Sequence, residues 1–210
     1  ILPCVLLLFF LVLFPLFYSL WASFSEIEVR AGGLQTIFVG LDNYDKVLDD
    51  PTFWSSLGVT ATMCIIIIPV QLLLGLGIAL LLETFSERIR NSVGMIIYIP
   101  MMVAAVVVGF MFRMIYHELF GPLNYILRTL NIVSAPIPFL SDPAWALPSI
   151  ILVDIWEWTP FWVLALLAGI VGLPREPYEA TSIDGANSWQ RFRYLTIPYL
   201  SPLIAVLLLI

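Results

Sequence analysis

One uncharged stretch decides the fold class of this chain: Cys64-Ile-Ile-Ile-Ile-Pro-Val-Gln-Leu-Leu-Leu-Gly-Leu-Gly-Ile-Ala-Leu-Leu-Leu82. A run of this length without charges is what an α-helix needs to cross the ~30 Å hydrocarbon layer of a membrane. Pro69, Gly75 and Gly77 lie inside the run. Such residues weaken a helix in water, but membranes tolerate them because small side chains let helices approach closely. We therefore expect a membrane-spanning helix within residues 53–82.

The composition of the whole chain agrees with a membrane protein. Of its 210 residues, 61% are hydrophobic and 11% are charged, and the mean hydropathy is +1.01. A soluble domain of this length would need a more polar surface. The net charge of −6 is small and scattered, with no basic stripe, so we expect no nucleic-acid partner. Cys4 and Cys64 lie in apolar runs, which favours small buried hydrophobic side chains over a disulfide.

Five apolar runs predict an all-α, polytopic transmembrane helix bundle. The expected spans are residues 1–24, 53–82, 93–117, 145–172 and an interrupted last run at 199–210. Pro100 predicts a kink in the third span. A secretory signal peptide is the rival interpretation of the first run, but that run lacks a charged start and a small-residue cleavage site. Because the chain begins and ends inside apolar runs, we expect a single transmembrane domain over residues 1–210, truncated at both ends.

The distribution of basic residues predicts which loops lie inside the cell. Two polar loops are expected outside, residues 25–51 with a turn at Gly32-Gly33, and residues 118–144 with a short helix near 123–130. Short loops rich in Arg face the cytoplasm. The segments after the second and after the fourth expected span hold five of the nine Lys and Arg residues: Arg88, Arg90, Arg175, Arg191 and Arg193. The polar segment at residues 174–198 is therefore expected in the cytoplasm.

That segment carries helix signals on both sides of a glycine: Pro177-Tyr-Glu-Ala-Thr-Ser-Ile-Asp-Gly-Ala-Asn-Ser-Trp-Gln-Arg-Phe-Arg-Tyr-Leu-Thr-Ile-Pro198. Pro177 suits the first turn of a helix, where no partner is needed for its missing N–H. Asp184-Gly185 then breaks the helix, because Gly tolerates left-handed backbone. We expect Ser188 to cap a second helix.

In the second helix, Trp189 and Phe192 share one face at positions i and i+3. Arg191 and Arg193 are expected to point elsewhere, toward water or lipid phosphates, and Pro198 is expected to close the helix. By themselves these features fit an ordinary amphipathic linker at a membrane surface as well as a docking element.

The same segment resembles the EAA loop of the permease subunits of bacterial ABC importers. The residues in register with that pattern are Glu179, Ala180, Asp184, Gly185 and Ala186, followed by Phe192 and Pro198 at its downstream end. Thr181 replaces the usual second Ala, and a small side chain there still allows close packing. Likeness to the carbohydrate class, which includes maltose, glycerol-phosphate and polyol permeases, extends over residues 39–44, 75–82, 155–161 and 166–169.

This resemblance implies a subunit with a core of six helices that moves a sugar or polyol across the bacterial inner membrane. It implies four kinds of partner, namely an ABC ATPase dimer, a second permease chain, an extracytoplasmic solute-binding protein and membrane lipid. The implied ATPase-coupling residues are Glu179, Ala180, Asp184, Gly185, Ala186, Trp189 and Phe192. The sequence has no Gly-rich phosphate loop ending in Lys-Ser or Lys-Thr, so we expect no cofactor and no catalysis of its own. ATP is expected to be used by the partner ATPase.

Two acidic residues inside the fourth span mark a candidate substrate path. Asp154 and Glu157 are three positions apart and so share one face of a helix. A charge inside a bilayer costs about 2.5–3.5 kcal/mol on insertion scales, and it usually faces protein or a water-filled path. Trp156 and Trp158 offer flat apolar surfaces beside them, and carboxylates accept hydrogen bonds from sugar hydroxyls.

Other interpretations of these residues and of the chain remain open at this point. Asp154 and Glu157 would serve structure alone if they paired with Arg113 or His117, or bonded to a neighbouring helix. The lone His has no second ligand at metal-binding spacing, so no metal site is expected. A channel or secondary transporter without an ATPase would carry more polar lining, and a membrane enzyme would need a catalytic cluster. A glycerol-phosphate substrate would need more cationic groups than Arg113, so we prefer a neutral carbohydrate.

Overall fold

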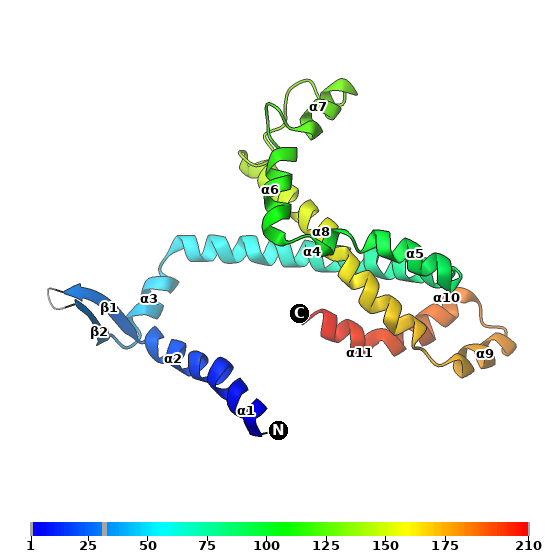
Figure 1. Cartoon of the computed structure of the whole chain (residues 1–210), viewed down its shortest axis with the longest axis horizontal. Helices are drawn as coiled ribbons and strands as arrows, with labels where there is room; N and C mark the ends of the chain where they lie inside the picture. The colour runs from blue at the N-terminus through cyan, green and yellow to red at the C-terminus, as the bar shows by residue number, and fades with distance from the viewer. Residues whose placement is uncertain (1, 31–32, 210) are drawn as a thin grey trace. The chain divides into compact units, whose positions relative to one another are not determined.

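The computed structural model describes residues 2–30 and 33–209, and helices form most of this part of the chain (Figure 1). Its elements in chain order are α1 (Leu2–Leu8), a π-helical turn (Phe9–Leu13), α2 (Phe14–Ser23), β1 (Ser25–Arg30), β2 (Gly33–Phe38), α3 (Asp42–Leu48), α4 (Pro51–Glu83), α5 (Glu87–Ile97), a 3₁₀ turn (Pro100–Met102), α6 (Ala105–Ile115), α7 (Pro122–Thr129), α8 (Pro143–Val171), α9 (Arg175–Ile183), α10 (Ser188–Arg191), a second π-helical turn (Phe192–Thr196) and α11 (Ile197–Leu207). The chain divides into two compact units, residues 1–61 and 62–210. The predicted all-α class is confirmed, although the described residues include one β-hairpin.

Three helical segments of the described chain are long and apolar enough to cross a membrane: Val5–Ser23, α4 and α8. With 33 residues, α4 is about 50 Å long at 1.5 Å per residue. That length exceeds the ~30 Å hydrocarbon layer, so α4 extends beyond it. The three segments match the spans expected at residues 1–24, 53–82 and 145–172.

The third expected span, residues 93–117, is not one kinked helix. The structure breaks it into α5 and α6, with a 3₁₀ turn and extended backbone at Val103 and Ala104 between them. Pro100 has no N–H to donate to the carbonyl of Ile96. That carbonyl instead accepts from the N–H of Ile99 at 3.3 Å, which tightens the chain and ends the α-helix. At 11 residues each, α5 and α6 are too short to span alone.

The expected polar loop at residues 25–51 contains a hairpin and a helix. β1 and β2 pair antiparallel, from Ser25 opposite Phe38 to Arg30 opposite Gly33. The predicted turn falls partly on residue 32, which lies outside the described residues. Asn43 at the start of α3 donates from its side chain to the carbonyls of Ser23 and Ser25, each at 3.0 Å. This amide therefore fastens α3 to the end of α2 and to the start of the hairpin.

The other outer loop, residues 118–144, contains the short helix expected near 123–130, here α7. Asn124 in α7 is buried, and its side chain exchanges two hydrogen bonds with the backbone of Ile137, at 3.0 and 2.8 Å. These bonds hold the irregular chain after α7 against the helix.

The core of the second unit is formed where α4, α8 and α11 meet. Its buried members are Ala79, Leu82, Trp162, Val163, Leu166, Leu167, Ile170, Leu200 and Leu207. Gly75 permits the contact between α4 and α8, because a Cβ added there would lie 2.6 Å from Cβ of Trp162. Gly169 has the same role between α8 and α11, where an added Cβ would lie 2.6 Å from the Leu203 side chain. Small residues thus set the helix crossings, as expected in membranes.

The prediction that the cysteines are buried is wrong for Cys64, whose side chain is exposed. The buried face of α4 begins at Ile67 and continues through Gln71, Gly75, Ala79 and Leu82. Because this helix is apolar on every side, its composition does not reveal which face packs. The side chain of Cys4 lies outside the described part of the structure.

Candidate functional site

The first helix of the loop at residues 174–198, α9, ends in a hydrogen-bonded turn. The N–H of Gly185 donates to the carbonyl of Ser182 at 3.2 Å, and the N–H of Ala186 donates to the carbonyl of Thr181 at 3.0 Å. This pair of bonds is the Schellman motif, which ends a helix with one left-handed residue. Gly185 supplies that residue with φ of +81°. The predicted break at Asp184-Gly185 is confirmed.

The second helix of the loop, α10, begins at a capping box one residue earlier than predicted. Asn187, rather than Ser188, is the N-cap. Its Oδ1 accepts from the N–H of Gln190 at 2.9 Å, and Oε1 of Gln190 accepts from the N–H of Asn187 at 2.8 Å. The spacing of a short polar residue and Gln three positions later is itself a sequence signal for this motif.

Pro198 does not close the second helix, contrary to prediction. The chain passes from α10 through the π-helical turn directly into α11, so it is helical from Ser188 to Leu207. Pro198 leaves the carbonyl of Tyr194 without its usual donor. A π-helical turn accommodates such a gap, because its hydrogen bonds run one residue further along the chain.

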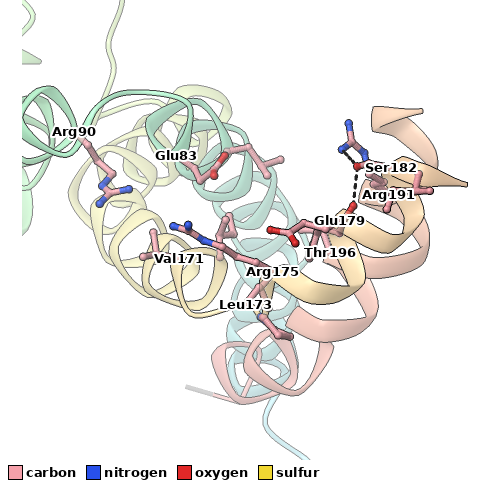
Figure 2. A pocket seen from close by; sticks show the side chains of 14 residues that line it. Glu83, Arg90, Val171, Leu173, Arg175, Glu179, Ser182, Arg191 and Thr196 are labelled. Carbon is pink, nitrogen blue, oxygen red and sulfur yellow. Dashed lines mark hydrogen bonds between the residues drawn. The ribbon is translucent and has the colours of Figure 1, made fainter. Parts of the chain in front are cut away.

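Arg191 joins the two helices of the loop, although it was expected to point toward water or lipid. Its Nη1 donates to Oγ of Ser182 at 2.8 Å (Figure 2). Its Nη2 donates to Oγ of Ser188 at 3.4 Å. The hydroxyls of Tyr178 and Thr196 share a further hydrogen bond of 2.9 Å. The loop is therefore fastened across its two helices by side chains as well as by its turns.

Most of the residues predicted to couple to an ATPase lie on the surface of this loop. Exposed members are Glu179, Ala180, Asp184, Gly185 and Trp189, while Ala186 and Phe192 are half-buried. The rings of Trp189 and Phe192 lie 5.5 Å apart between centroids, which confirms their shared face. Ile183 was not predicted, yet its side chain is 87% exposed next to the glycine turn. Among the described residues, none apart from the immediate chain neighbours of Gly185 has an atom within 4 Å of a Cβ added there, so the turn has free space beside it.

The candidate substrate path contains a cavity of about 240 Å³ between α6 and α8. Its polar and aromatic lining comes from Phe112 and Arg113 on α6, from Tyr116 directly after that helix, and from Asp154 and Glu157 on α8. The remaining lining is aliphatic or glycine. The structure thus brings both predicted carboxylates to one space, together with an arginine.

A third helix holds Asp154 in place. Gln71 of α4 is only 4% exposed, and its Nε2 donates to Oδ1 of Asp154 at 3.0 Å and to the Asp154 carbonyl at 3.2 Å. Among the alternatives for Asp154, the bond to a neighbouring helix is the one present. Sequence reasoning does not identify the role of Gln71, because a single amide in an apolar run does not indicate which residue it bonds to.

Glu157 differs from Asp154 because nothing in the described chain satisfies it. Its side chain is 9% exposed and has no hydrogen bond or ion pair with any described residue. A buried carboxylate without donors is costly. The Glu157 carboxylate lines the cavity and has no bonded partner in the described chain.

The two predicted tryptophans do not line this cavity. Trp156 is 40% exposed, and its ring packs at 5.3 Å, edge to face, against Phe112. Trp158 is 47% exposed and packs at 6.5 Å against Phe161. Neighbouring helical residues are turned about 100° from Glu157, since a helix has ~3.6 residues per turn. Both rings therefore face other sides of α8.

His117, the other predicted partner for the carboxylates, also lies outside the cavity lining. Its Nδ1 accepts from the N–H of Leu119 at 3.2 Å, and its ring stacks on Phe120. No three His, Cys, Asp or Glu side chains gather as a metal site among residues 2–30 and 33–209.

Known proteins match the chain over the loop and the cavity. The family described as "Binding-protein-dependent transport system inner membrane component" matches residues 71–210. The "Probable ABC transporter permease protein y4oQ" of Sinorhizobium fredii is 38% identical over 194 residues, covering 91% of this chain and 61% of that protein. The "Trehalose/maltose transport system permease protein MalF" of Thermococcus litoralis is 32% identical over 212 residues, covering 100% of this chain and 70% of that protein.

A solved structure is similar over almost the whole chain. It is described as "Crystal structure of bacterial alginate ABC transporter in complex with alginate pentasaccharide-bound periplasmic protein". The match has a TM-score of 0.78 and 26% sequence identity, and it covers 99% of this chain and 68% of that one. The chain thus spans 61–70% of the length of the proteins it matches here.

Proposed function

Because this chain belongs to the family of inner-membrane components of binding-protein-dependent transport systems, we propose that it is the transmembrane subunit of an ATP-driven carbohydrate importer. In this proposal it moves a neutral sugar or polyol into the cytoplasm and hydrolyses nothing itself. A separate ABC ATPase dimer uses the ATP, a second permease chain completes the pathway, and a solute-binding protein delivers the substrate. The loop at residues 174–198 lies on the cytoplasmic side, in keeping with its arginines.

The observation that carries this proposal is the geometry of that loop. Its two helices are fixed by a Schellman turn, a capping box and the bonds of Arg191. Ile183 and Trp189 nevertheless expose 87% and 66% of their surfaces. A loop that is rigid yet presents large apolar side chains fits a cleft in a partner, because rigid anchors lose little entropy on binding. In our proposal this cleft belongs to the ATPase.

Movement of the docked loop would reach the membrane through α11. This helix continues from the loop without interruption and packs Leu200 and Leu207 into the core with α8 and α4. ATP binding that favours one arrangement of the ATPase dimer would shift the population of the helices between inward-open and outward-open states.

The cavity around Glu157 supports a neutral rather than an acidic substrate. Two carboxylates and one arginine face it, so acceptors for sugar hydroxyls outnumber groups that would bind an anion. We propose that Asp154 and Glu157 accept hydrogen bonds from hydroxyls of the passing carbohydrate. Trp156 and Trp158 lie on other faces of α8 and would contact the substrate only where another helix completes the path.

Affinity purification of the full-length protein tests the class of transporter. The protein is extracted from its native membrane in a mild detergent, and its companions are identified by mass spectrometry. We expect an ABC ATPase and a second permease chain in constant ratio. A chain that purifies alone would overturn the importer proposal in favour of a channel or secondary transporter.

Transport assays of Glu157→Gln test the path. The assembled transporter is reconstituted with its binding protein, whose bound sugar identifies the substrate. A hydrogen bond to a charged group contributes about 1.5–3 kcal/mol, so we expect uptake at low substrate to fall about tenfold or more. Glu118→Gln, an exposed residue outside the cavity, is the matched control. Unchanged uptake by Glu157→Gln would remove this residue from the path.

A further inference from the structure

A larger cavity, of about 650 Å³, lies where the loop meets the ends of the bundle helices. Its walls come from the end of α4, from α5, from the end of α8, from α9 and from the π-helical turn before α11 (Figure 2). Of the residues that the sequence assigns to ATPase coupling, only Glu179 lines it, together with Ile183 next to the glycine turn. The cavity therefore needs an explanation of its own.

Four charged side chains face this cavity without pairing. Arg90 comes from α5, Arg175 from the start of α9, Glu83 from the end of α4 and Glu179 from within α9. In the described chain none of them forms an ion pair or a side-chain hydrogen bond. Figure 2 shows the guanidinium groups of Arg90 and Arg175 extending toward each other across the cavity. Two converging cations, neither of which forms an ion pair in the described chain, indicate a place for an anion.

A fifth charged residue of the lining is already engaged. Arg191 donates to the hydroxyls of Ser182 and Ser188. The groups available to a ligand are thus two positive and two negative, and they come from three helices.

The rest of the lining is largely apolar and lies at the ends of membrane spans. Its aliphatic members are Leu80, Ile170, Val171, Leu173 and Ile183. Leu80 belongs to the last turn of α4, and Val171 ends α8, the two longest apolar helices of the described chain. In a membrane crossed by α4 and α8, the ends of these helices would meet the boundary between the hydrocarbon and headgroup layers. A ligand that contacts both the charged and the aliphatic parts of the lining is apolar at one end and charged at the other, as a phospholipid is.

We propose that this cavity binds the headgroup of phosphatidylethanolamine. The phosphate lies between Arg90 and Arg175, and the ammonium donates hydrogen bonds to the carboxylates of Glu83 and Glu179. A headgroup with one charge of each sign matches two cations and two anions. Phosphatidylglycerol would leave the carboxylates without an ammonium, and phosphatidylcholine carries a methylated ammonium that has no N–H to donate. The bound lipid would connect α9 to α4 and α5, so it is a structural part of the loop.

Competition between lipids in nanodiscs tests this assignment. The assembled full-length transporter is reconstituted in equal parts of phosphatidylethanolamine, phosphatidylcholine and phosphatidylglycerol, and retained lipid is identified by native mass spectrometry. We expect phosphatidylethanolamine to be retained above both others. Equal retention of the ethanolamine and choline lipids would overturn the proposal, because choline has three methyl groups in place of the three N–H donors of ethanolamine.

Variants of the charged residues sharpen the test. A basic residue near anionic lipid groups contributes about 1 kcal/mol, so Arg90→Gln and Arg175→Gln should each lower retention about fivefold. Glu83→Gln should shift the preference toward phosphatidylglycerol, since the arginines remain. Arg88→Gln and Glu87→Gln are matched controls, because both lie on α5, are exposed and do not line the cavity.

Two further results would overturn the proposal. One is retention in Arg90→Gln and Arg175→Gln equal to that in Arg88→Gln. The other is displacement of the lipid by free phosphoethanolamine, which would assign the cavity to a soluble zwitterion. Retention is measured without substrate or ATP, so a negative result here leaves the importer proposal untouched.

Discussion

The loop at residues 174–198 and the cavity around Glu157 are both polar sites in an apolar chain, but they are built at different ranges of sequence. In the loop, the bonds that set the backbone join near neighbours, such as Ala186 to Thr181 and Gln190 to Asn187. In the cavity, Asp154 is positioned by Gln71, which is 83 positions away. The loop is therefore encoded locally, whereas the cavity exists only after α4, α6 and α8 have packed.

This contrast predicts that substitutions in the loop change coupling, while substitutions in the bundle change folding. The largest effect is expected at Gly185. Gly185→Val places a branched side chain at φ of +81° and on the open face of the turn. Transport should fall to background, while insertion of the protein and ATP hydrolysis by the complex persist.

A second variant at Gly185 separates backbone strain from lost space. Asn tolerates left-handed backbone better than other residues with a Cβ, so Gly185→Asn keeps the turn but fills the space beside it. We expect it to abolish uptake as well, measured in proteoliposomes. Normal uptake by Gly185→Asn would mean that the turn, and not the free space, is what coupling needs. Normal uptake by both variants would remove Gly185 from the docking surface.

The next largest effect is expected where α4 crosses α8. Gly75→Leu puts a side chain where an added Cβ already lies 2.6 Å from Cβ and 3.2 Å from the backbone carbon of Trp162. Because backbone cannot move aside, we expect about 3 kcal/mol of destabilisation, the upper part of the usual range for overpacking. Thermal unfolding in detergent measures it. Gly77→Leu, two positions along α4 with no atom within 4 Å of its added Cβ, should be nearly neutral, and equal losses in both would contradict the close crossing.

A smaller loss of stability is expected when the long-range bond of the cavity is removed. Gln71→Leu leaves the Asp154 carboxylate without its donor, which should cost about 2 kcal/mol. Combining it with Asp154→Leu removes both partners. The double variant should lose less stability than the sum of the two single variants, with a coupling of about 0.5–3 kcal/mol. Additive losses would show that the two residues act independently.

The smallest effect is expected in the loop's own turn. Asn187→Ala removes the N-cap and should cost about 1 kcal/mol, confined to the loop. Amide hydrogen exchange should rise around residues 187–191, while the unfolding temperature of the bundle stays unchanged. Asn187→Asp preserves the cap and serves as the control. A lower unfolding temperature for the whole bundle in Asn187→Ala would remove the contrast between a local loop and a long-range core.

The features best predicted from the sequence are those that depend on residues close together along the chain. The spans around α4 and α8 follow from long apolar runs, and the break at Gly185 follows from a glycine next to a short polar residue. The cap at Asn187 has an equally local signal, because its partner Gln190 stands three positions later, whereas the adjacent Ser188, the predicted cap, is also of a capping residue type. These signals are local, since each depends on residues within one or two helical turns.

Features that depend on distant contacts could not be predicted in the same way. Gln71 was unremarked because its partner, Asp154, lies on another helix. Cys64 was expected to be buried because an all-apolar helix does not show which face packs. Pro100 was expected to kink a continuous helix, but the α-helix ends before it. Pro198 was expected to end a helix, but the helix continues through it. A proline alone therefore does not specify whether a helix bends, ends or continues. The first strand of the hairpin does carry a local signal, because Glu26-Ile-Glu-Val-Arg30 alternates polar and apolar residues as a half-buried strand does, whereas Gly33–Phe38 does not alternate.

The continuous helical run from Ser188 to Leu207 connects the loop directly to the core of the bundle. At 1.5 Å per residue it is about 30 Å long, with exposed Trp189 near one end and buried Leu207 at the other. Near its middle the run contacts α8, where the side chains of Leu200 and Leu203 lie against Gly169. A stiff arm that pivots near its middle reverses the direction of motion between its ends. If the run turns about that contact as one body, a push on Trp189 in one direction would move Leu207 in the opposite direction.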